Sequence, residues 1–279
     1  MKKMKKIIII SIVVILLLVV TAFIFIIYGN QRIPILAYHN MAPREERNKY
    51  TKDNFWTVEA EKFDKEMKFL KDNHFKTLTM QEFYDWKKGK IELPRKSVLI
   101  TFDDGYYSNY KYAFPILKKY GLNATVFVIG AMLPDKQDSY KEGTPPTDEY
   151  IAHDTLEKIK TEYPNIEICS HSFNLHESEG GLKDKSYDWL MEDMRNFKEN
   201  IGETPYFAYP RGVYNDTIIQ ALKDSGYKMA FLFGEEKKDG KEKSFEKASR
   251  SDDDYKIPRL NISNKMDLNR FELRMLLPF

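Results

Sequence analysis

Short apolar runs alternate with amphipathic stretches from residue 33 almost to the end of the chain, and this alternation predicts alternating strands and helices. The predicted strands are 33–39, 75–78, 97–102, 124–129, 166–170, 206–209, 227–233 and 257–262. The predicted helices are 59–73, 80–88, 112–120, 154–162, 187–200, 215–225 and 268–277. Strands that alternate with helices at this spacing are typical of a parallel α/β sheet or barrel.

Three polar segments interrupt this pattern, and we predict that they are loops. Residues 40–57 are polar and irregular, and residues 133–149 are rich in Pro, Asp and Lys. Residues 234–256 carry many Lys, Glu and Asp side chains and almost no apolar ones, which is typical of a solvated loop.

An uncharged run, 7–28, precedes the alternating pattern. As a helix with a rise of ~1.5 Å per residue it spans roughly 33 Å, enough to cross the hydrocarbon core of a bilayer. Four lysines, at positions 2, 3, 5 and 6, lie directly before it, so the positive-inside rule places the N-terminus in the cytoplasm. A cleavable signal peptide is the alternative, but the run is long and no small-x-small site follows it. We therefore expect a cytoplasmic tail (1–6), a single-pass cell-membrane anchor (7–28) and an extracellular domain (29–279).

Charge and cysteine content narrow the class of protein. The formal net charge is +2, and four of the positive charges are the lysines at positions 2, 3, 5 and 6, so the remainder sums to 2 − 4 = −2. This balance does not indicate a nucleic-acid partner. Cys169 is the only cysteine, which excludes an intrachain disulfide, and its apolar strand pattern predicts a buried, inert thiol.

Polar side chains gather where the predicted strands end. His39, Asp103, Asp104, His171 and Arg211 all lie at or just past a predicted strand end. In α/β barrels the carboxyl ends of the strands form the active-site face. Adjacent carboxylates are costly to bury, but Asp and Gly are also common in ordinary turns. The pair at 103 and 104 together with the two histidines 171 and 176 points to a metal-dependent hydrolase.

His171 and His176 are five residues apart, so two ligands for one ion require the chain to turn between them. Together with Asp104 they make a set of two histidines and one carboxylate, which leaves coordination positions open for water and substrate. A divalent ion in such a site polarises a carbonyl and lowers the pKa of its bound water. Asp103 is then placed to act as a general base on that water.

Three motifs resemble the polysaccharide deacetylases, carbohydrate esterase family four. Thr101–Gly105 matches the first motif, Ser170–His176 resembles the second and Phe207–Gly212 resembles the third. The resemblance extends over roughly residues 33 to 265. It implies a distorted (β/α) barrel and metal-dependent removal of N-acetyl groups from a cell-surface polysaccharide that contains N-acetylglucosamine.

The same resemblance implies the roles of individual residues. Asp103 would be the base, and Asp104, His171 and His176 would hold one divalent ion, for which zinc suits the mixed imidazole and carboxylate donors. A backbone N–H near Arg211 would stabilise the oxyanion together with the metal. Sugar rings pack on aromatic faces, so two motif tyrosines, Tyr106 and Tyr209, are predicted to line the groove.

The chain departs from the usual family pattern in three ways. Most members space the two histidines four apart, and the spacing of five is similar to the subgroup that acts on poly-N-acetylglucosamine exopolysaccharide. Ala208 stands where an arginine usually pairs with the base, and Arg259 is a candidate replacement from another strand, with Arg211 left as a groove residue. No histidine follows His176, so the usual late general acid is absent, and we propose His39 as the proton donor.

Several alternatives remain open at this level. The substrate is either an exopolysaccharide or the peptidoglycan beside the membrane. The same site also suits an O-acetyl glycan esterase, whose better leaving group needs less acid assistance. A non-catalytic glycan-binding domain that kept the fold is a further alternative, supported by the missing late histidine. The oligomeric state is not predicted.

Overall fold

The computed structural model describes residues 6, 10–21, 31–137, 149–174, 182–233 and 247–277. Residues 10–21 form a helix, and no helix in these ranges is both long and apolar enough to cross a membrane. The predicted anchor, 7–28, includes residues outside the described ranges, so it stays a prediction. Much of the predicted loops 133–149 and 234–256 also lies outside them.

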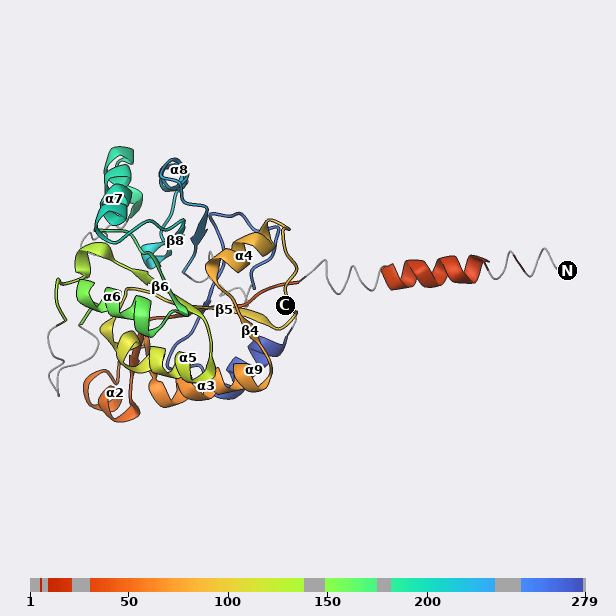
Figure 1. Cartoon of the computed structure of the whole chain (residues 1–279), viewed down its shortest axis with the longest axis horizontal. Helices are drawn as coiled ribbons and strands as arrows, with labels where there is room; N and C mark the ends of the chain where they lie inside the picture. The colour runs from red at the N-terminus through yellow and green to blue at the C-terminus, as the bar shows by residue number, and fades with distance from the viewer. Residues whose placement is uncertain are drawn as a thin grey trace.

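The core of the described structure is an eight-stranded sheet in the order β10-β1-β5-β6-β7-β8-β9, with β4 paired to β5 (Figure 1). Every neighbouring pair within it is parallel. The strands are β1 (Ile35–Tyr38), β4 (Lys76–Thr77), β5 (Ser97–Phe102), β6 (Ala124–Val128), β7 (Ile166–Ser170), β8 (Tyr206–Ala208), β9 (Met229–Phe231) and β10 (Leu260–Asn261). The predicted parallel α/β architecture is therefore confirmed.

The sheet curls, and segment 254–261 connects β9, at one edge, with β1, which lies next to the other edge strand, β10. At its start, the Ile257 carbonyl accepts a hydrogen bond from Leu232 N at 2.8 Å, and Ile257 N donates to the Ala230 carbonyl at 3.1 Å. At its end, Leu260 pairs with Leu36 of β1. The result is an irregular (β/α) barrel in which the last strand lies beside the first.

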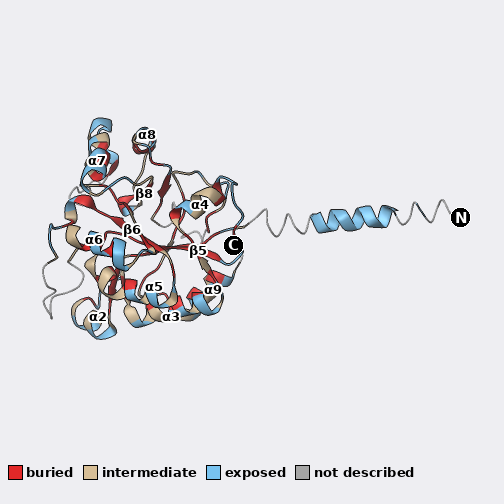
Figure 2. Cartoon of the chain, viewed as in Figure 1, coloured by how far each residue is buried: buried red, intermediate tan, exposed pale blue. Residues whose placement is uncertain are grey.

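Helices cover the outside of the sheet, and α3 packs against both α5 and α9 (Figure 1). The helices are α2 (Arg44–Tyr50), α3 (Ala60–Asp72), α4 (Met80–Lys87), α5 (Phe114–Tyr120), α6 (His153–Glu162), α7 (Tyr187–Asn200), α8 (Asp216–Asp224) and α9 (Leu268–Leu276). Figure 2 shows buried strands surrounded by helices that keep exposed outer faces.

Alternate strand residues separate into two packed layers, because successive side chains point to opposite faces of a sheet. Leu36, Ile100 and Val126 belong to the cluster that packs against α3, α5 and α9. Leu99 and Phe127 belong to a second cluster, with Cys169 and residues of α4. Cys169 is buried, as predicted, and burial raises the pKa of its thiol.

The prediction that residues 40–57 form a loop is wrong. This segment contains β2 (Asn40–Ala42), α2 and the start of β3 (Thr57–Glu59), and β2 and β3 pair in parallel as a small second sheet. The strands are too short to show a period, and α2 has no buried residue, so it has no apolar stripe that a pattern can reveal.

Other elements begin or end differently from the prediction. The predicted helix 112–120 is a π-helical turn, η1 (Asn109–Ala113), followed by α5, with Pro115 in the first turn of α5. Proline is tolerated there because the first N–H groups of a helix have no intrahelical partner. The predicted strand 257–262 shortens to β10 because its first half bonds to the end of β9 rather than continuing the β1 ladder.

Candidate active site

The loop that follows β5 is fixed by its own sequence, Thr101–Gly105. The Thr101 hydroxyl donates to the Leu36 carbonyl at 2.7 Å, and Asp103 N donates to the Tyr38 carbonyl at 2.9 Å. The chain then turns through left-handed backbone at Asp104 (φ 71°) and Gly105 (φ 78°). A Cβ on residue 105 would lie 2.9 Å from Val128 Cγ1, so glycine is required both for the turn and for the close approach to β6.

Asp103 and Arg259 form a buried ion pair inside the barrel. Arg259 Nη1 lies 2.7 Å from Asp103 Oδ1, and Arg259 Nη2 lies 2.7 Å from Asp103 Oδ2. Arg259 also donates to the Thr101 hydroxyl and, through Nε, to the Leu232 carbonyl. Burial alone would raise the pKa of Asp103, but the charge and hydrogen bonds of Arg259, with the charges of His171 and His39, hold it below its ordinary value.

His39, which follows β1, lies beside this pair. Its Nε2 atom is 3.9 Å from Asp103 Oδ2. The ring packs against both Trp56 and Phe233 at centroid distances of 5.1 Å, and those two rings also contact each other at 5.1 Å. Burial lowers the pKa of His39 more than the nearby carboxylates raise it, and its Nδ1 atom has no hydrogen-bond partner among the described residues. The ring is thus held by packing, next to the carboxylate.

Asp104 faces His171, which follows β7. His171 Nε2 lies 3.4 Å from Asp104 Oδ1, and His171 Nδ1 lies 2.8 Å from the Ala208 carbonyl. Because a carbonyl only accepts, Nδ1 carries a proton there. Burial lowers the pKa of His171, but the hydrogen bond to Asp104 and the charges of Asp103 and Asp104 raise it by more. The pKa of His171 therefore lies above its ordinary value. Tyr106 also donates a hydrogen bond to Asp104.

This donor set fits a divalent ion. Because the Ala208 carbonyl keeps the proton on Nδ1, a neutral His171 would have Nε2 available, beside the Asp104 carboxylate, to bind an ion, and this is the tautomer that ligating histidines adopt. The described residues contain no group of three or more His, Cys, Asp or Glu arranged around one ion. The third predicted ligand, His176, lies outside the described residues.

The remaining predicted site residues have different positions. Arg211 is exposed, has left-handed backbone (φ 56°), and does not reach Asp103. Tyr106 is half-buried and stacks on Tyr150.

Tyr209 was expected in the groove, and the structure contradicts this. Its side chain is fully buried, and its hydroxyl donates to the Tyr255 carbonyl at 3.0 Å. The reason is strand alternation: Phe207 and Tyr209 share the face that packs against α7 and α8.

Residues 90–230, about half of the chain, match the family model described as polysaccharide deacetylase. This range includes Asp103, Asp104 and His171. The chain belongs to the polysaccharide deacetylase family. The family prediction is thereby confirmed.

Two curated relatives of this deacetylase show the extent of the similarity. YxkH of Bacillus subtilis, whose name places it with the polysaccharide deacetylases, is 33% identical over 201 residues, which is 71% of this chain and 63% of YxkH. The chain thus spans somewhat less than two thirds of that relative. The poly-beta-1,6-N-acetyl-D-glucosamine N-deacetylase of Staphylococcus aureus is 31% identical over 221 residues, 75% of this chain and 69% of the relative.

Two solved structures share the fold. Streptococcus pyogenes deacetylase PplD has a TM-score of 0.69 at 24% identity and covers 88% of this chain and 99% of its own. IcaB from Ammonifex degensii also has a TM-score of 0.69, at 23% identity, with 88% of this chain and 98% of its own covered. At this identity the likeness concerns the fold alone.

Three residues that contact the site were not predicted from the sequence: Trp56, Phe233 and Asp193. The two aromatic residues lie in segments predicted as a loop and at a strand end, where no pattern marks them as neighbours of His39. A signal in the sequence could have indicated Asp193. It occupies the apolar stripe of α7 together with Leu190 and Met194, and a buried carboxylate on such a stripe calls for partners.

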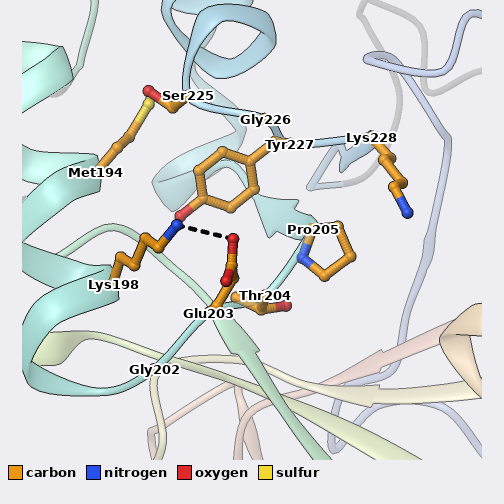
Figure 3. A pocket seen from close by; sticks show the side chains of 10 residues that line it. All are labelled: Met194, Lys198, Gly202, Glu203, Thr204, Pro205, Ser225, Gly226, Tyr227 and Lys228. Carbon is orange, nitrogen blue, oxygen red and sulfur yellow. Dashed lines mark hydrogen bonds and ion pairs between the residues drawn. The ribbon is translucent and has the colours of Figure 1, made fainter.

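A pocket of about 250 Å³ lies elsewhere in the deacetylase (Figure 3). Its lining residues, Gly202–Pro205 and Ser225–Lys228, precede β8 and β9, so it lies at the opposite end of the strands from Asp103. An ion pair of 2.8 Å between Lys198 and Glu203 crosses it. No carboxylate–histidine pair lines this pocket within the described part of the chain, so it is separate from the candidate active site.

Proposed function

We propose that this polysaccharide deacetylase hydrolyses N-acetyl groups of an N-acetylglucosamine polymer, using one zinc ion, on the outer side of the membrane. The observation that carries the proposal is the buried Asp103 carboxylate. Arg259 keeps it ionised and fixes both of its oxygens, while the Asp104–His171 pair lies next to it. An ionised, oriented carboxylate beside a candidate metal site is the arrangement that base-assisted hydrolysis requires.

The side chains divide the proton transfers between them. Asp103 takes a proton from the attacking water, and Arg259 holds the carboxylate in place during this step. The leaving amine requires a proton, and His39, 3.9 Å from Asp103, is the donor that we propose. Trp56 and Phe233 limit the rotation of the His39 ring, so its Nε2 atom stays directed at the reacting groups.

Asp104 and His171 would hold the metal ion, together with His176 from the sequence motif. When bound, a divalent ion lowers the pKa of water and polarises the acetyl carbonyl. Mixed imidazole and carboxylate donors support zinc as this ion. The hydrogen bond from Tyr106 would help to orient Asp104. Arg211 would present its backbone N–H to the oxyanion.

The substrate proposal rests on the relatives and on the histidine spacing. The S. aureus relative is named for poly-beta-1,6-N-acetyl-D-glucosamine, and it is 31% identical to this chain over 221 residues. An exopolysaccharide is therefore favoured over peptidoglycan. With residues 7–28 as a membrane anchor, the domain would work at the cell surface, where each acetyl group removed exposes an amine and makes the polymer more cationic.

The Arg259–Asp103 pair also bears on the non-catalytic alternative. A glycan-binding domain would have no use for a buried carboxylate held ionised by two 2.7 Å hydrogen bonds. The O-acetyl esterase alternative is favoured by one feature, the absence of a histidine after His176. Each alternative predicts its own outcome in the acetate-release assay described next.

The test is acetate release by the full chain, purified in detergent and loaded with zinc. The substrates are β-1,6-linked and β-1,4-linked N-acetylglucosamine oligomers and an O-acetylated xylo-oligosaccharide. Asp103→Asn is the informative variant. Asp224→Asn, an exposed aspartate of α8, is the matched control.

We expect release from the β-1,6 oligomer, loss of release in Asp103→Asn, and no effect of Asp224→Asn. Release only from the β-1,4 oligomer would move the substrate to peptidoglycan-like polymers. Release only from the xylo-oligosaccharide would establish an esterase. Saturable oligomer binding without any release would leave a glycan-binding domain.

A further inference from the structure

The chain leaves regular structure immediately after His171, and the conformation of this segment is unusual. We define the histidine loop as residues 171–174, which lead toward His176. Within it, Ser172 has left-handed backbone (φ 72°) although it carries a side chain. Such backbone costs free energy and persists only where the surroundings hold it, most often at functional sites. The contacts of the loop show what holds it.

One carboxylate, that of Asp193 in α7, accepts three hydrogen bonds from the loop. The Ser172 hydroxyl donates to Oδ2 at 2.7 Å, and Phe173 N donates to the same oxygen at 2.9 Å. Asn174 N donates to Oδ1 at 2.7 Å. Asp193 is buried, with a relative exposure of 4%. Both of its oxygens therefore accept hydrogen bonds from consecutive residues of the histidine loop.

The loop is fixed from its other side by the residues after β6. Gly130 N donates to the Ser172 carbonyl at 3.1 Å, and Ala131 N donates to the Phe173 carbonyl at 2.8 Å. The Phe173 ring lies over Gly130, where an added Cβ would be 2.3 Å from Phe173 Cδ2. The N–H groups of Phe173 and Asn174 thus bond to α7, and the carbonyls of Ser172 and Phe173 bond to the segment after β6.

We propose that Asp193 is a positioning residue that sets the histidine loop for metal binding. The inference rests on the proposed function, because it assigns His171 and His176 to the metal. Asp193 does not touch the ion. It fixes the backbone of residues 172–174, directly after His171, whose ring faces Asp104.

A purely structural role for Asp193 makes a different prediction. If Asp193 served only to attach α7 to the barrel, removing it would lower stability and leave the metal affinity of the folded protein unchanged. If it positions the loop, metal affinity falls in protein that is still folded. Partners outside the ligand shell of a metal site commonly change its affinity by ~10- to 100-fold.

The experiment uses the full chain, stripped of metal and titrated with Zn²⁺ alone by calorimetry. Hydrogen exchange of the peptide that contains residues 172–174 is followed in the same samples. Asp193→Asn keeps the shape of the side chain but replaces one acceptor oxygen by a donor. Ser172→Ala removes one of the three hydrogen bonds and is the milder variant if Asp193→Asn folds poorly. Glu66→Gln, a buried carboxylate of α3, is the matched control.

We expect zinc binding to weaken ~10- to 100-fold in Asp193→Asn and roughly 2- to 10-fold in Ser172→Ala. Exchange in the histidine loop should be faster in both variants, and Glu66→Gln should bind zinc as the wild type does. Unchanged zinc affinity in folded Asp193→Asn and Ser172→Ala, or a wild-type chain that binds no zinc, would overturn the inference. A wild type that binds zinc but releases no acetate would refute the proposed function while these affinities still test Asp193.

Discussion

The Arg259 guanidinium holds the Asp103 carboxylate through two parallel hydrogen bonds of 2.7 Å, across 156 positions of sequence. Both side chains are almost completely buried. A charge in such a place is tolerated only because its counter-charge is there too. The ion pair therefore links the stability of the barrel to the ionisation of Asp103, the proposed catalytic base.

Replacing Arg259 by methionine should damage both stability and activity. The change leaves Asp103 as an uncompensated buried charge, and we expect a loss of about 3–5 kcal/mol in the free energy of unfolding and acetate release reduced by roughly 100-fold or more. Urea unfolding and kcat measure the two effects. Arg250→Met, which breaks the exposed Arg250–Glu92 pair, is the control and should cost no more than about 1 kcal/mol. Equal losses in the two variants would contradict the role of Arg259.

Removing the Tyr106 hydroxyl should weaken metal binding without unfolding the protein. Tyr106→Phe keeps the ring that stacks on Tyr150 and deletes the hydrogen bond to Asp104. We expect zinc affinity to fall roughly 2- to 10-fold, with little change in Tm. Tyr110→Phe, which deletes a hydrogen bond to Glu162 on the surface, is the control. If both variants bind zinc as the wild type does, the hydroxyl does not orient Asp104.

Glu66 should make the protein less stable as the pH rises. Burial raises its pKa from 4.5 to about 7, against the opposing effects of Lys62 and Tyr38. The folded state thus binds the proton more tightly than the unfolded state. The stabilisation is complete below pH 4.5 and is lost as the pH rises through about 7. The difference corresponds to about 3 kcal/mol.

Glu66→Gln removes this dependence. We expect the variant to be more stable than the wild type at pH 8 and to lose that advantage at pH 5. Urea unfolding of both proteins at a series of pH values gives the difference directly. A difference that does not change with pH would show that Glu66 titrates normally in the folded state.

Gly130→Ala should displace the Phe173 ring, because the new methyl group has no room. The added Cβ would lie 2.3 Å from Phe173 Cδ2. Overpacking of this kind typically costs about 1–3 kcal/mol. The double variant Gly130→Ala/Phe173→Leu should recover part of the loss, which a thermodynamic cycle of unfolding free energies measures. Strict additivity of the two changes would exclude a direct clash.

Long periodic elements were predictable from the sequence alone. The predicted helix 187–200 and strand 97–102 have the same ends in the structure, α7 and β5. β5 is buried at every position and α7 buries residues at helical spacing, and both patterns can be recognised in the local sequence. The helix α2 was not predicted because it buries no residue. It is held by tertiary contacts, such as the Glu46–Tyr112 hydrogen bond.

The candidate site was predictable only in part. Asp103, Asp104 and His171 follow strands, and parallel strands bring their carboxyl ends together, so their proximity follows from the pattern. Trp56 and Asp193 act through contacts between segments that no local pattern connects. Tyr209 was misplaced because its motif position does not say which face of β8 it occupies.

The neighbours of β1 have a consequence for how the enzyme becomes active. β1 lies between β5 and β10, so the first strand of the barrel gains one of its two partners only when the last strand is in place. Contacts between such distant parts of a chain slow folding. Since synthesis proceeds from the N-terminus, an incomplete chain holds the aspartate pair without the Arg259 counter-charge. A chain shortened before residue 259 keeps both aspartates but lacks this counter-charge, and we expect it to have no activity.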